Sequence, residues 1–257
     1  MNPVFFTTVA ALVGAVIGSF LNVCIVRIPA RRSVVLPSSA CGQCGRLLTW
    51  VENIPIVSYL MLRGRCRGCG THISLQYPLV EALTAVMFAG LWWAYGPGVP
   101  LASRLILGCL LVVLFAIDLE HHLLPNVLTL PGIAIGFAFS FFQEPGWQSS
   151  LIGIIVGGGV LYLIAEAYYR WRHEEGLGMG DVKMLAMIGA FVGWKLTLVA
   201  LMMSSVAGSV VGLALIAAQR GNMKYALPFG TFLAMGAALA STVGPGVLTW
   251  YVGLLQP

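Results

Sequence analysis

Residues 3–26 read PVFFTTVAALVGAVIGSFLNVCIV, a stretch without a single charged side chain. A transmembrane helix needs about 20 consecutive and mainly apolar residues, so this stretch is long enough to cross a bilayer. No basic residue precedes it, whereas a secretory signal peptide begins with a positively charged region. We therefore expect residues 3–26 to form a membrane span that is retained.

The rest of the chain has a similar composition. It is 59% hydrophobic and 9% charged, compared with about 45–50% and about 25% in soluble domains. A soluble fold cannot bury so much apolar surface, so the surrounding solvent must be lipid. The sequence therefore predicts an all-α polytopic membrane protein. Its eight expected spans lie near residues 3–26, 77–95, 101–118, 125–143, 149–170, 182–198, 200–218 and 228–253.

Positive charge is concentrated in the loop after the first span. Seven of the 14 Lys and Arg residues lie between Arg27 and Arg67, with Glu52 the one acid among them. Cytoplasmic loops carry an excess of Lys and Arg, so we expect residues 27–76 to be cytosolic and the N-terminus to lie outside. Alternation of eight spans then leaves 12 of the 14 basic residues on the cytosolic side, including Arg220 and Lys224. The net charge of +5 is thus explained by topology, and nucleic acid is not an expected partner.

Four of the six cysteines form two CxxCG motifs within this loop, with 21 residues between Cys44 and Cys66. The glycine that ends each motif can adopt a positive φ and turn the backbone around a metal ion. Four thiolates in such pairs suit a structural zinc site. Two disulfides are the alternative, but they require an oxidising compartment. The expected ligands are Cys41, Cys44, Cys66 and Cys69.

Two acidic residues end or begin predicted spans at membrane depth. Asp118 closes the third span, and Asp181 opens the sixth within Gly178-Met-Gly180-Asp181-Val-Lys183. Because one span runs inward and the other outward, both carboxylates should reach the cytosolic membrane face. Ionisable groups at such a depth are costly and are functional candidates. Two neighbouring carboxylates can divide the work of peptide hydrolysis, one activating water and the other protonating the leaving nitrogen.

Each residue around this pair also has a structural alternative. Asp181 suits an N-cap and Asp118 an interfacial helix end. Gly178 and Gly180 favour the catalytic interpretation, because residues without side chains let an extended substrate come close. Lys183 is expected to contact lipid phosphates, to steady the carboxylate or to act as a positive-inside anchor. A transporter that moves protons or cations through its intramembrane acids is the rival from another functional class.

Two other acids are expected to be structural. Glu166 lies four residues before Arg170 and can pair with it on a helix. Glu81 has no local partner, so it could contribute to a site or bind another buried polar group, and a structural role is favoured.

Taken together, these residues resemble the bacterial type IV prepilin peptidase family, the bifunctional leader peptidase and N-methyltransferase of pilus and type II secretion systems. The resemblance covers nearly the whole chain and rests on the order of its motifs. They are Gly18-Ser-Phe20-Leu-Asn22-Val23, Arg27-Ile-Pro29, the two cysteine pairs, Asn53-Ile-Pro55, Leu62-Arg63-Gly64, Tyr77-Pro78-Leu-Val-Glu81, Asp118 with Leu124-Pro125-Asn126, Gly178-Met-Gly180-Asp181 and Pro228-Phe229-Gly230.

The resemblance implies a GxGD-type aspartyl protease with Asp118 and Asp181 as its catalytic pair. It further implies that prepilins or type II secretion pseudopilins are the substrates. Their short basic leader is removed after a glycine, at the cytosolic face of the bacterial inner membrane. The chain departs from the family pattern at three positions. These are Gln76, Asn126 and Thr231, where arginine, aspartate and proline are usual.

Methylation of the new N-terminal residue, with S-adenosylmethionine as donor, is implied by the resemblance alone. No strand followed by a glycine-rich turn and a distant acid is visible, so no nucleotide-type fold is predicted. A peptidase without methyltransferase activity therefore stays an alternative. Glu52 and Asn53, between the two cysteine pairs, are the candidate methyltransferase residues.

The expected organisation has three parts. Residues 1–26 are the first transmembrane helix, residues 27–76 the cytosolic four-cysteine zinc domain, and residues 77–257 a seven-helix membrane aspartyl protease core. Membrane lipid surrounds the first and third parts. The sequence leaves open whether the chain forms homo-oligomers.

Overall fold

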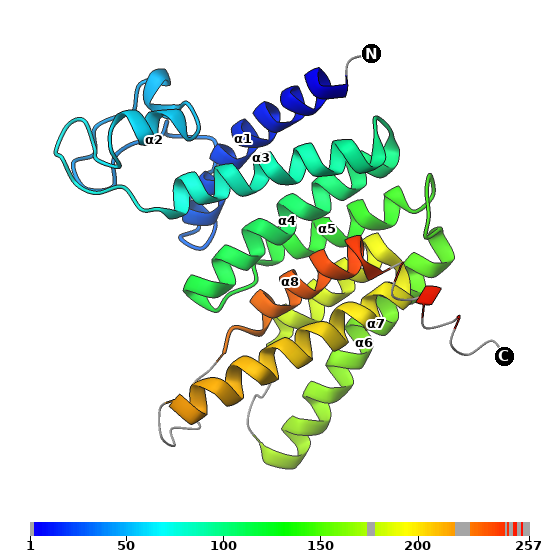
Figure 1. The fold of residues 1–257 in the computed structure, drawn as a ribbon. Helices are drawn as coiled ribbons and strands as arrows, with labels where there is room; N and C mark the ends of the chain where they lie inside the picture. Colours follow the sequence, from blue (N-terminus) through cyan, green and yellow to red (C-terminus); the bar gives the residue numbers. More distant parts are fainter. Residues whose placement is uncertain are drawn as a thin grey trace. The chain divides into compact units, whose positions relative to one another are not determined.

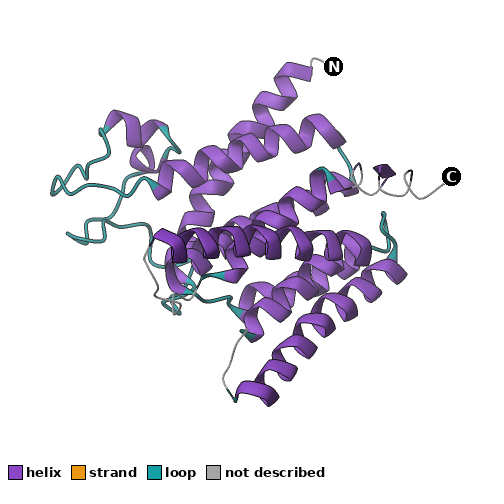
Figure 2. Ribbon diagram, turned by 60° about the horizontal axis from the view of Figure 1, so that its bottom comes forward, coloured by secondary structure: helices purple, strands orange, loops and turns teal. Residues whose placement is uncertain are grey.

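The computed structural model describes residues 3–173, 178–218 and 227–244, together with residues 246, 249, 250 and 253. Within these residues every regular element is a helix (Figure 2), and β-type pairing is limited to two isolated bridges. The predicted all-α class is thus confirmed. The chain forms two compact units, Met1–Val113 and Leu114–Pro257.

Five helices in the described residues are long and apolar enough to cross a membrane. They are α1 (Pro3–Arg27), α3 (Gln76–Tyr95), α4 (Val99–His121), α6 (Trp147–Arg172) and α7 (Met179–Ala218). The apolar helices α5 (Asn126–Phe139) and α8 (Phe229–Thr242) are shorter (Figure 1). The last predicted span, residues 228–253, is described continuously only as far as residue 244. Arg220 and Lys224 also lie outside the described residues. The predicted polytopic membrane fold is confirmed.

The first unit is built on α1 and α3, which run side by side (Figure 1). A Cβ atom added to Gly14 would lie 2.6 Å from the backbone oxygen of Thr84, and one added to Gly18 would lie 2.8 Å from the Cα atom of Glu81. Small residues at helix interfaces let backbones approach closely in lipid. Between α1 and α3 lies the cysteine loop, residues 28–75, which includes η1 (Trp50–Asn53) and α2 (Val57–Met61).

The second unit is organised around α7, which packs against α5, α6 and α8. The α6–α7 contact is a backbone contact, because a side chain on Gly153 would collide with the carbonyl oxygen of Gly189. The Ser150 hydroxyl of α6 also donates a 2.7 Å hydrogen bond to the Ala190 carbonyl oxygen of α7.

One break between helices differs from its expected place. The sequence predicts separate spans over residues 182–198 and 200–218, whereas α7 continues from Met179 to Ala218 with a single non-helical residue at Gly193 (φ 76°, ψ 169°). Glycine adopts such a φ without steric cost. A Cβ atom there would also lie 2.9 Å from the Cβ atom of Pro145. The kink is therefore fixed at Gly193 by conformation and by packing, before the predicted boundary.

Candidate functional site

The first candidate site is in the second unit and contains Asp118, near the end of α4. Its side chain is buried, with 5% of the residue exposed. The Thr231 backbone N–H donates a 2.8 Å hydrogen bond to Asp118 Oδ2, and the Thr231 hydroxyl lies 3.3 Å from the same atom. Thr231 is in the first turn of α8. The carboxylate therefore sits at a helix N-terminus, where backbone N–H groups and the helix dipole stabilise negative charge.

The second carboxylate, Asp181, is in the first turn of α7 and is 9% exposed. Because α7 begins at Met179, Asp181 is the third residue of the helix rather than its N-cap. The Gly178 backbone hydrogen-bonds the Asp181 side chain. A Cβ atom on Gly178 would stay 3.5 Å from Asp181 Oδ2, whereas one on Gly180 would lie 2.8 Å from the Cβ atom of Leu124. Gly180 therefore also has a packing reason to lack a side chain.

These two carboxylates belong to one cluster. Asp118 and Asp181 are close enough for their charges to interact. Leu124 links their surroundings, because positions 180 and 230 both lie against it, and a Cβ atom on Gly230 would be 2.9 Å from Leu124 Cδ1 and 2.8 Å from Asp118 Oδ2. Two buried carboxylates in one cluster could divide the acid and base roles that peptide hydrolysis requires.

Other charged residues of the sequence analysis have ordinary partners. Lys183 Nζ donates a 2.9 Å hydrogen bond to Asn126 Oδ1, which ties the start of α7 to the start of α5. Arg170 Nε donates a 2.8 Å hydrogen bond to Glu166 Oε1, so the predicted i, i+4 pair is confirmed. Glu81 Oε2 accepts a 2.7 Å hydrogen bond from the Ile56 N–H, so Glu81 does bind another polar group of the chain.

A second cluster lies in the first unit, where the two CxxCG motifs fold alike. In each motif an isolated bridge closes the loop, Ala40 with Leu47 and Arg65 with His72. The glycine after each motif has a positive φ, 69° at Gly45 and 72° at Gly70, as expected. Local backbone geometry thus prepares each pair of thiols before any ion binds.

The four thiols meet at one point and could hold a metal ion. All six cysteines are free thiols, and the Sγ atoms of Cys41, Cys44, Cys66 and Cys69 lie within 4.8 Å of one another. Zn–S bonds of about 2.3 Å in a tetrahedron set sulfur atoms about 3.8 Å apart, and the Cys41 and Cys69 sulfurs are 3.8 Å apart. Hydrogen bonds from the Thr71 hydroxyl and N–H lower the pKa of Cys69 to about 6, which favours the thiolate that binds metal.

The candidate methyltransferase residues lie beside this cluster. Glu52 pairs with Arg46 and accepts 2.9 Å hydrogen bonds from the Thr49 N–H and hydroxyl. The Thr49 N–H, then its hydroxyl, and finally Arg46 hold the pKa of Glu52 below its usual value. Asn53 ends the same short helix. The contacts with Arg46 and Thr49 therefore give the Glu52 carboxylate a structural role.

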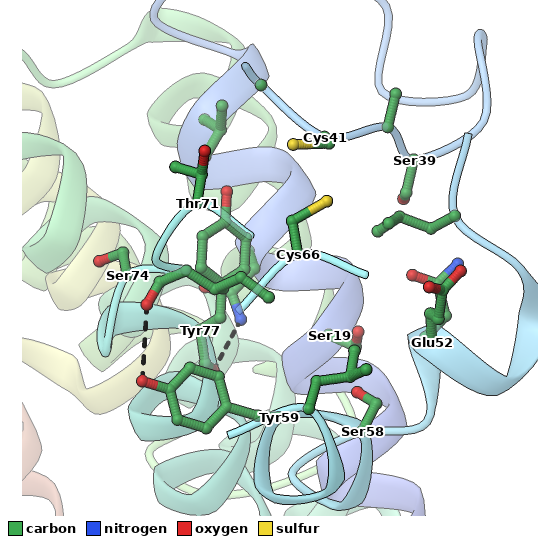
Figure 3. Close-up of a pocket in the computed structure, with 18 of the residues that line it drawn as sticks. Ser19, Ser39, Cys41, Glu52, Ser58, Tyr59, Cys66, Thr71, Ser74 and Tyr77 are labelled. Carbon is green, nitrogen blue, oxygen red and sulfur yellow. Dashed lines mark hydrogen bonds between the residues drawn. The ribbon is translucent and has the colours of Figure 1, made fainter. Parts of the chain in front are cut away.

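Glu52 and Asn53 line a pocket of about 460 Å³ within the first unit. Its walls come from the end of α1, the cysteine loop and the start of α3. In Figure 3, Cys41 and Ser39 stand at one end of this pocket and Tyr59 and Ser58 at the other. Its volume is within the range of about 300–1,000 Å³ that small-molecule sites occupy.

Three residues of these sites were not predicted as functional. Asn22 lines the pocket with Glu81, and Thr231 holds Asp118. A polar Asn22 inside an apolar span and a threonine at the start of a helix were visible in the sequence. Their partners are 55 residues away for Asn22 and 113 residues away for Thr231, so no local pattern could assign them a role.

Both halves of the chain match models of known protein families. Residues 12–95 match the Bacterial Peptidase A24 N-terminal domain, and residues 105–213 match the Type IV leader peptidase family. A Prepilin leader peptidase/N-methyltransferase of Pseudomonas putida is 34% identical over 99% of this chain and 96% of its own length. One of Aeromonas hydrophila is 35% identical over 97% of this chain and 95% of its own length.

A relative of the same name from Myxococcus xanthus is 42% identical over 83% of this chain, and the match spans 64% of that relative's length. No solved structure gives a significant match. The extent of the matches to the full-length relatives, together with the two domain matches, shows that the chain belongs to the type IV leader peptidase family.

Proposed function

We propose that this chain is a membrane aspartyl endopeptidase in which Asp118 and Asp181 are the catalytic residues. The observation that carries the proposal is the pair of buried, interacting carboxylates at the ends of α4 and α7. Family membership supports a protease, and the site itself supports the aspartyl type.

The two carboxylates would divide the proton transfers. The Thr231 N–H stabilises negative charge on Asp118, so we assign Asp118 as the base and Asp181 as the acid. Asp118 takes a proton from water as the water oxygen bonds to the scissile carbonyl carbon. Asp181 gives its proton to the leaving nitrogen as the C–N bond breaks, and solvent then restores both protonation states. No metal takes part in these steps.

Substitution of each aspartate tests this proposal. We expect Asp118→Asn and Asp181→Asn each to lower cleavage of a purified prepilin by about 1,000-fold or more, because proton transfer is lost. Glu166→Gln is the matched control, since Glu166 is a partly exposed helix carboxylate whose ion pair among the described residues is with Arg170. Retained cleavage in either aspartate variant would show that the substituted carboxylate is not catalytic.

We further propose prepilins and type II secretion pseudopilins as substrates, cut after the glycine that ends the basic leader. The names of the relatives and the motif resemblance support this assignment. Gly178, beside the Asp181 carboxylate, would leave room for the backbone of an extended substrate.

A second activity is proposed for the same chain, N-methylation of the newly exposed residue with S-adenosylmethionine. The names of the relatives support it, and the pocket in the first unit is large enough for such a donor. When bound, the donor would supply a methyl group to the newly exposed amine, which would release a proton as the donor's sulfonium became a neutral thioether. Incubating the enzyme with prepilin and methyl-labelled donor tests the activity, and unlabelled cleaved product would leave a peptidase alone.

We propose zinc as the ion of the four-cysteine cluster, in a structural role. Thiolate ligands in a tetrahedral arrangement favour zinc over oxygen-loving ions. Cys41, Cys44, Cys66 and Cys69 would hold it and so tie residues 27–76 into one domain.

The protein is a multi-pass membrane protein, and its detailed topology is a proposal. We propose that it lies in the bacterial inner membrane with the N-terminus outside and with residues 27–76 and both aspartates at the cytosolic side. The distribution of Lys and Arg supports this orientation. We also propose that residues 1–26, 27–76 and 77–257 are the first transmembrane helix, the zinc domain and the protease core. Modification of Arg67→Cys by a membrane-impermeant thiol reagent in intact inverted vesicles, but not in right-side-out spheroplasts, would support a cytosolic loop.

A further inference from the structure

The pocket in the first unit contains a buried hydrogen-bond acceptor that the protein leaves unused. Asn22 is 2% exposed and lines the pocket. Its Nδ2 group donates a 3.0 Å hydrogen bond to the Tyr77 carbonyl oxygen, whereas its Oδ1 atom has no partner among the described residues. A buried acceptor without a protein partner is costly to leave unsatisfied, so this atom can take a hydrogen bond from a molecule that enters the pocket.

Carboxylates give this pocket a negative side. Glu81, one turn into α3, is 7% exposed and holds the Ile56 N–H with Oε2, and the Ser19 hydroxyl also hydrogen-bonds it. Glu52 also lines the pocket, but its carboxylate is already paired with Arg46 and Thr49, so Glu81 carries most of this negative character. Such a surface attracts a positively charged group.

The same pocket also carries positive side chains. Arg27 and Arg67 line it, and Arg27 is held by the Ser33 carbonyl oxygen at 3.1 Å. A zwitterionic amino acid, with an ammonium and a carboxylate on one carbon, matches this mixture of charges. The N-terminus of a cleaved peptide offers the amine without the carboxylate, so the observations favour the former. The aromatic rings of Tyr59 and Tyr77 add flat surfaces for a base or a sulfonium.

We propose that this pocket binds the methyl donor S-adenosylmethionine, with Asn22 Oδ1 accepting a hydrogen bond from the donor's amino group and the Glu81 carboxylate facing the same positive end. This inference rests on the proposed methyltransferase function, which it deepens by locating donor binding at α1 and α3 rather than at Glu52 and Asn53 alone. Asn22 and Glu81 are thereby binding residues.

Donor binding by the full chain in detergent micelles tests the proposal. Equilibrium dialysis with labelled S-adenosylmethionine should show at least about tenfold weaker binding for Asn22→Leu, because a charge-assisted hydrogen bond is lost. Glu81→Gln is the second variant, since glutamine keeps an acceptor for the Ile56 N–H but removes the charge, and binding should weaken about fivefold or more. Thr84→Val is the matched control. Thr84 is fully buried in the same helix pair, bonds only the backbone of α3 and does not line the pocket.

Weaker binding in both pocket variants with unchanged binding in Thr84→Val supports the proposal. Unchanged donor affinity in Asn22→Leu overturns it, and so does equal weakening in all three variants, which would assign the effect to helix packing. A raised KM for the cleaved peptide with unchanged donor affinity would mean that the pocket takes the acceptor, again overturning it. The label-transfer assay tests the methyltransferase activity separately. Label transfer without this binding pattern would support the activity and refute the site. This binding pattern without label transfer would support the site and refute the activity.

Discussion

The carboxylate pair of the second unit and the pocket of the first treat their polar atoms differently. Asp118 is buried, and the chain itself supplies its donors from Thr231 at the start of α8. Asn22 is equally buried, but the chain satisfies only its amide nitrogen and leaves the oxygen unpaired. A reactive group must be oriented before the substrate arrives, whereas a binding group must remain available. This difference therefore separates a site built for chemistry from one built for a ligand.

Among the variants that follow, loss of a metal ligand in the first unit should have the largest effect. Cys41→Ser should weaken zinc binding by on the order of several hundredfold, because one of four ligands carries about a quarter of the binding free energy. Metal analysis after dialysis measures the loss, with Cys109→Ser as the control because Cys109 lies in α4 outside the cluster. Full zinc content in Cys41→Ser would show that the four thiols do not form the site.

A change beside Asp118 should affect cleavage to a similar but smaller degree. Gly230→Ala would place a Cβ atom 2.8 Å from Asp118 Oδ2, and displacement of a catalytic group by about 1 Å costs about 100-fold in rate. Gly159→Ala is the control, because a Cβ atom there meets no neighbour within 4 Å. The prediction is broken if prepilin cleavage by Gly230→Ala stays within threefold of the parent rate.

Thiol reactivity sharpens the description of the cysteine cluster. In metal-free protein at pH 7, a pKa of about 6 leaves Cys69 mostly thiolate, whereas a pKa of about 11 keeps Cys44 protonated. After correction for the lower nucleophilicity of the more acidic thiol, Cys69 should be alkylated about 50-fold faster. Site-resolved mass spectrometry after iodoacetamide treatment measures the ratio.

The pH profile of this labelling is a further check. Because the Cys69 pKa is depressed, its thiolate predominates above pH 6, and the labelling rate should fall about tenfold per pH unit below that value. Thr71→Val removes the hydroxyl that lowers this pKa and should shift the profile to higher pH. An unshifted profile would mean that the Thr71 hydroxyl does not act on the thiolate.

The smallest expected effect concerns the Thr231 hydroxyl. It lies 3.3 Å from Asp118 Oδ2, while the Thr231 N–H makes the shorter 2.8 Å bond that any residue except proline would keep. Thr231→Val should therefore slow cleavage only about three- to tenfold. Thr242→Val, at the other end of α8, provides the control. A loss as large as that of Asp118→Asn would assign the hydroxyl a much larger role than the geometry gives it.

Much of the fold followed from composition, because 20-residue apolar runs have few structures open to them in lipid. The helices α1 and α3 begin and end within two residues of the predicted spans. The kink at Gly193 was missed, because the sequence does not indicate which glycine of an apolar run adopts a positive φ. That choice depends on Pro145, which contacts it from another part of the chain.

The candidate sites divide in the same way. The alternating direction of the predicted spans put Asp118 and Asp181 at one membrane face, and CxxCG spacing predicted the thiol cluster that the structure contains. The roles of Asn22 and Thr231 depend on contacts between distant helices. A single sequence contains those residues but not the distances that join them.

The backbone contact between α6 and α7 has a mechanical consequence for the carboxylate pair. With Gly153 against Gly189 and Ser150 bonded to Ala190, these two helices have almost no freedom to slide past each other. Asp181, at the beginning of α7, therefore lies on a helix that is closely packed against α6. Asp118 is held by a different helix, through hydrogen bonds from the first turn of α8, so the distance between the two acids depends on how α7 and α8 pack together.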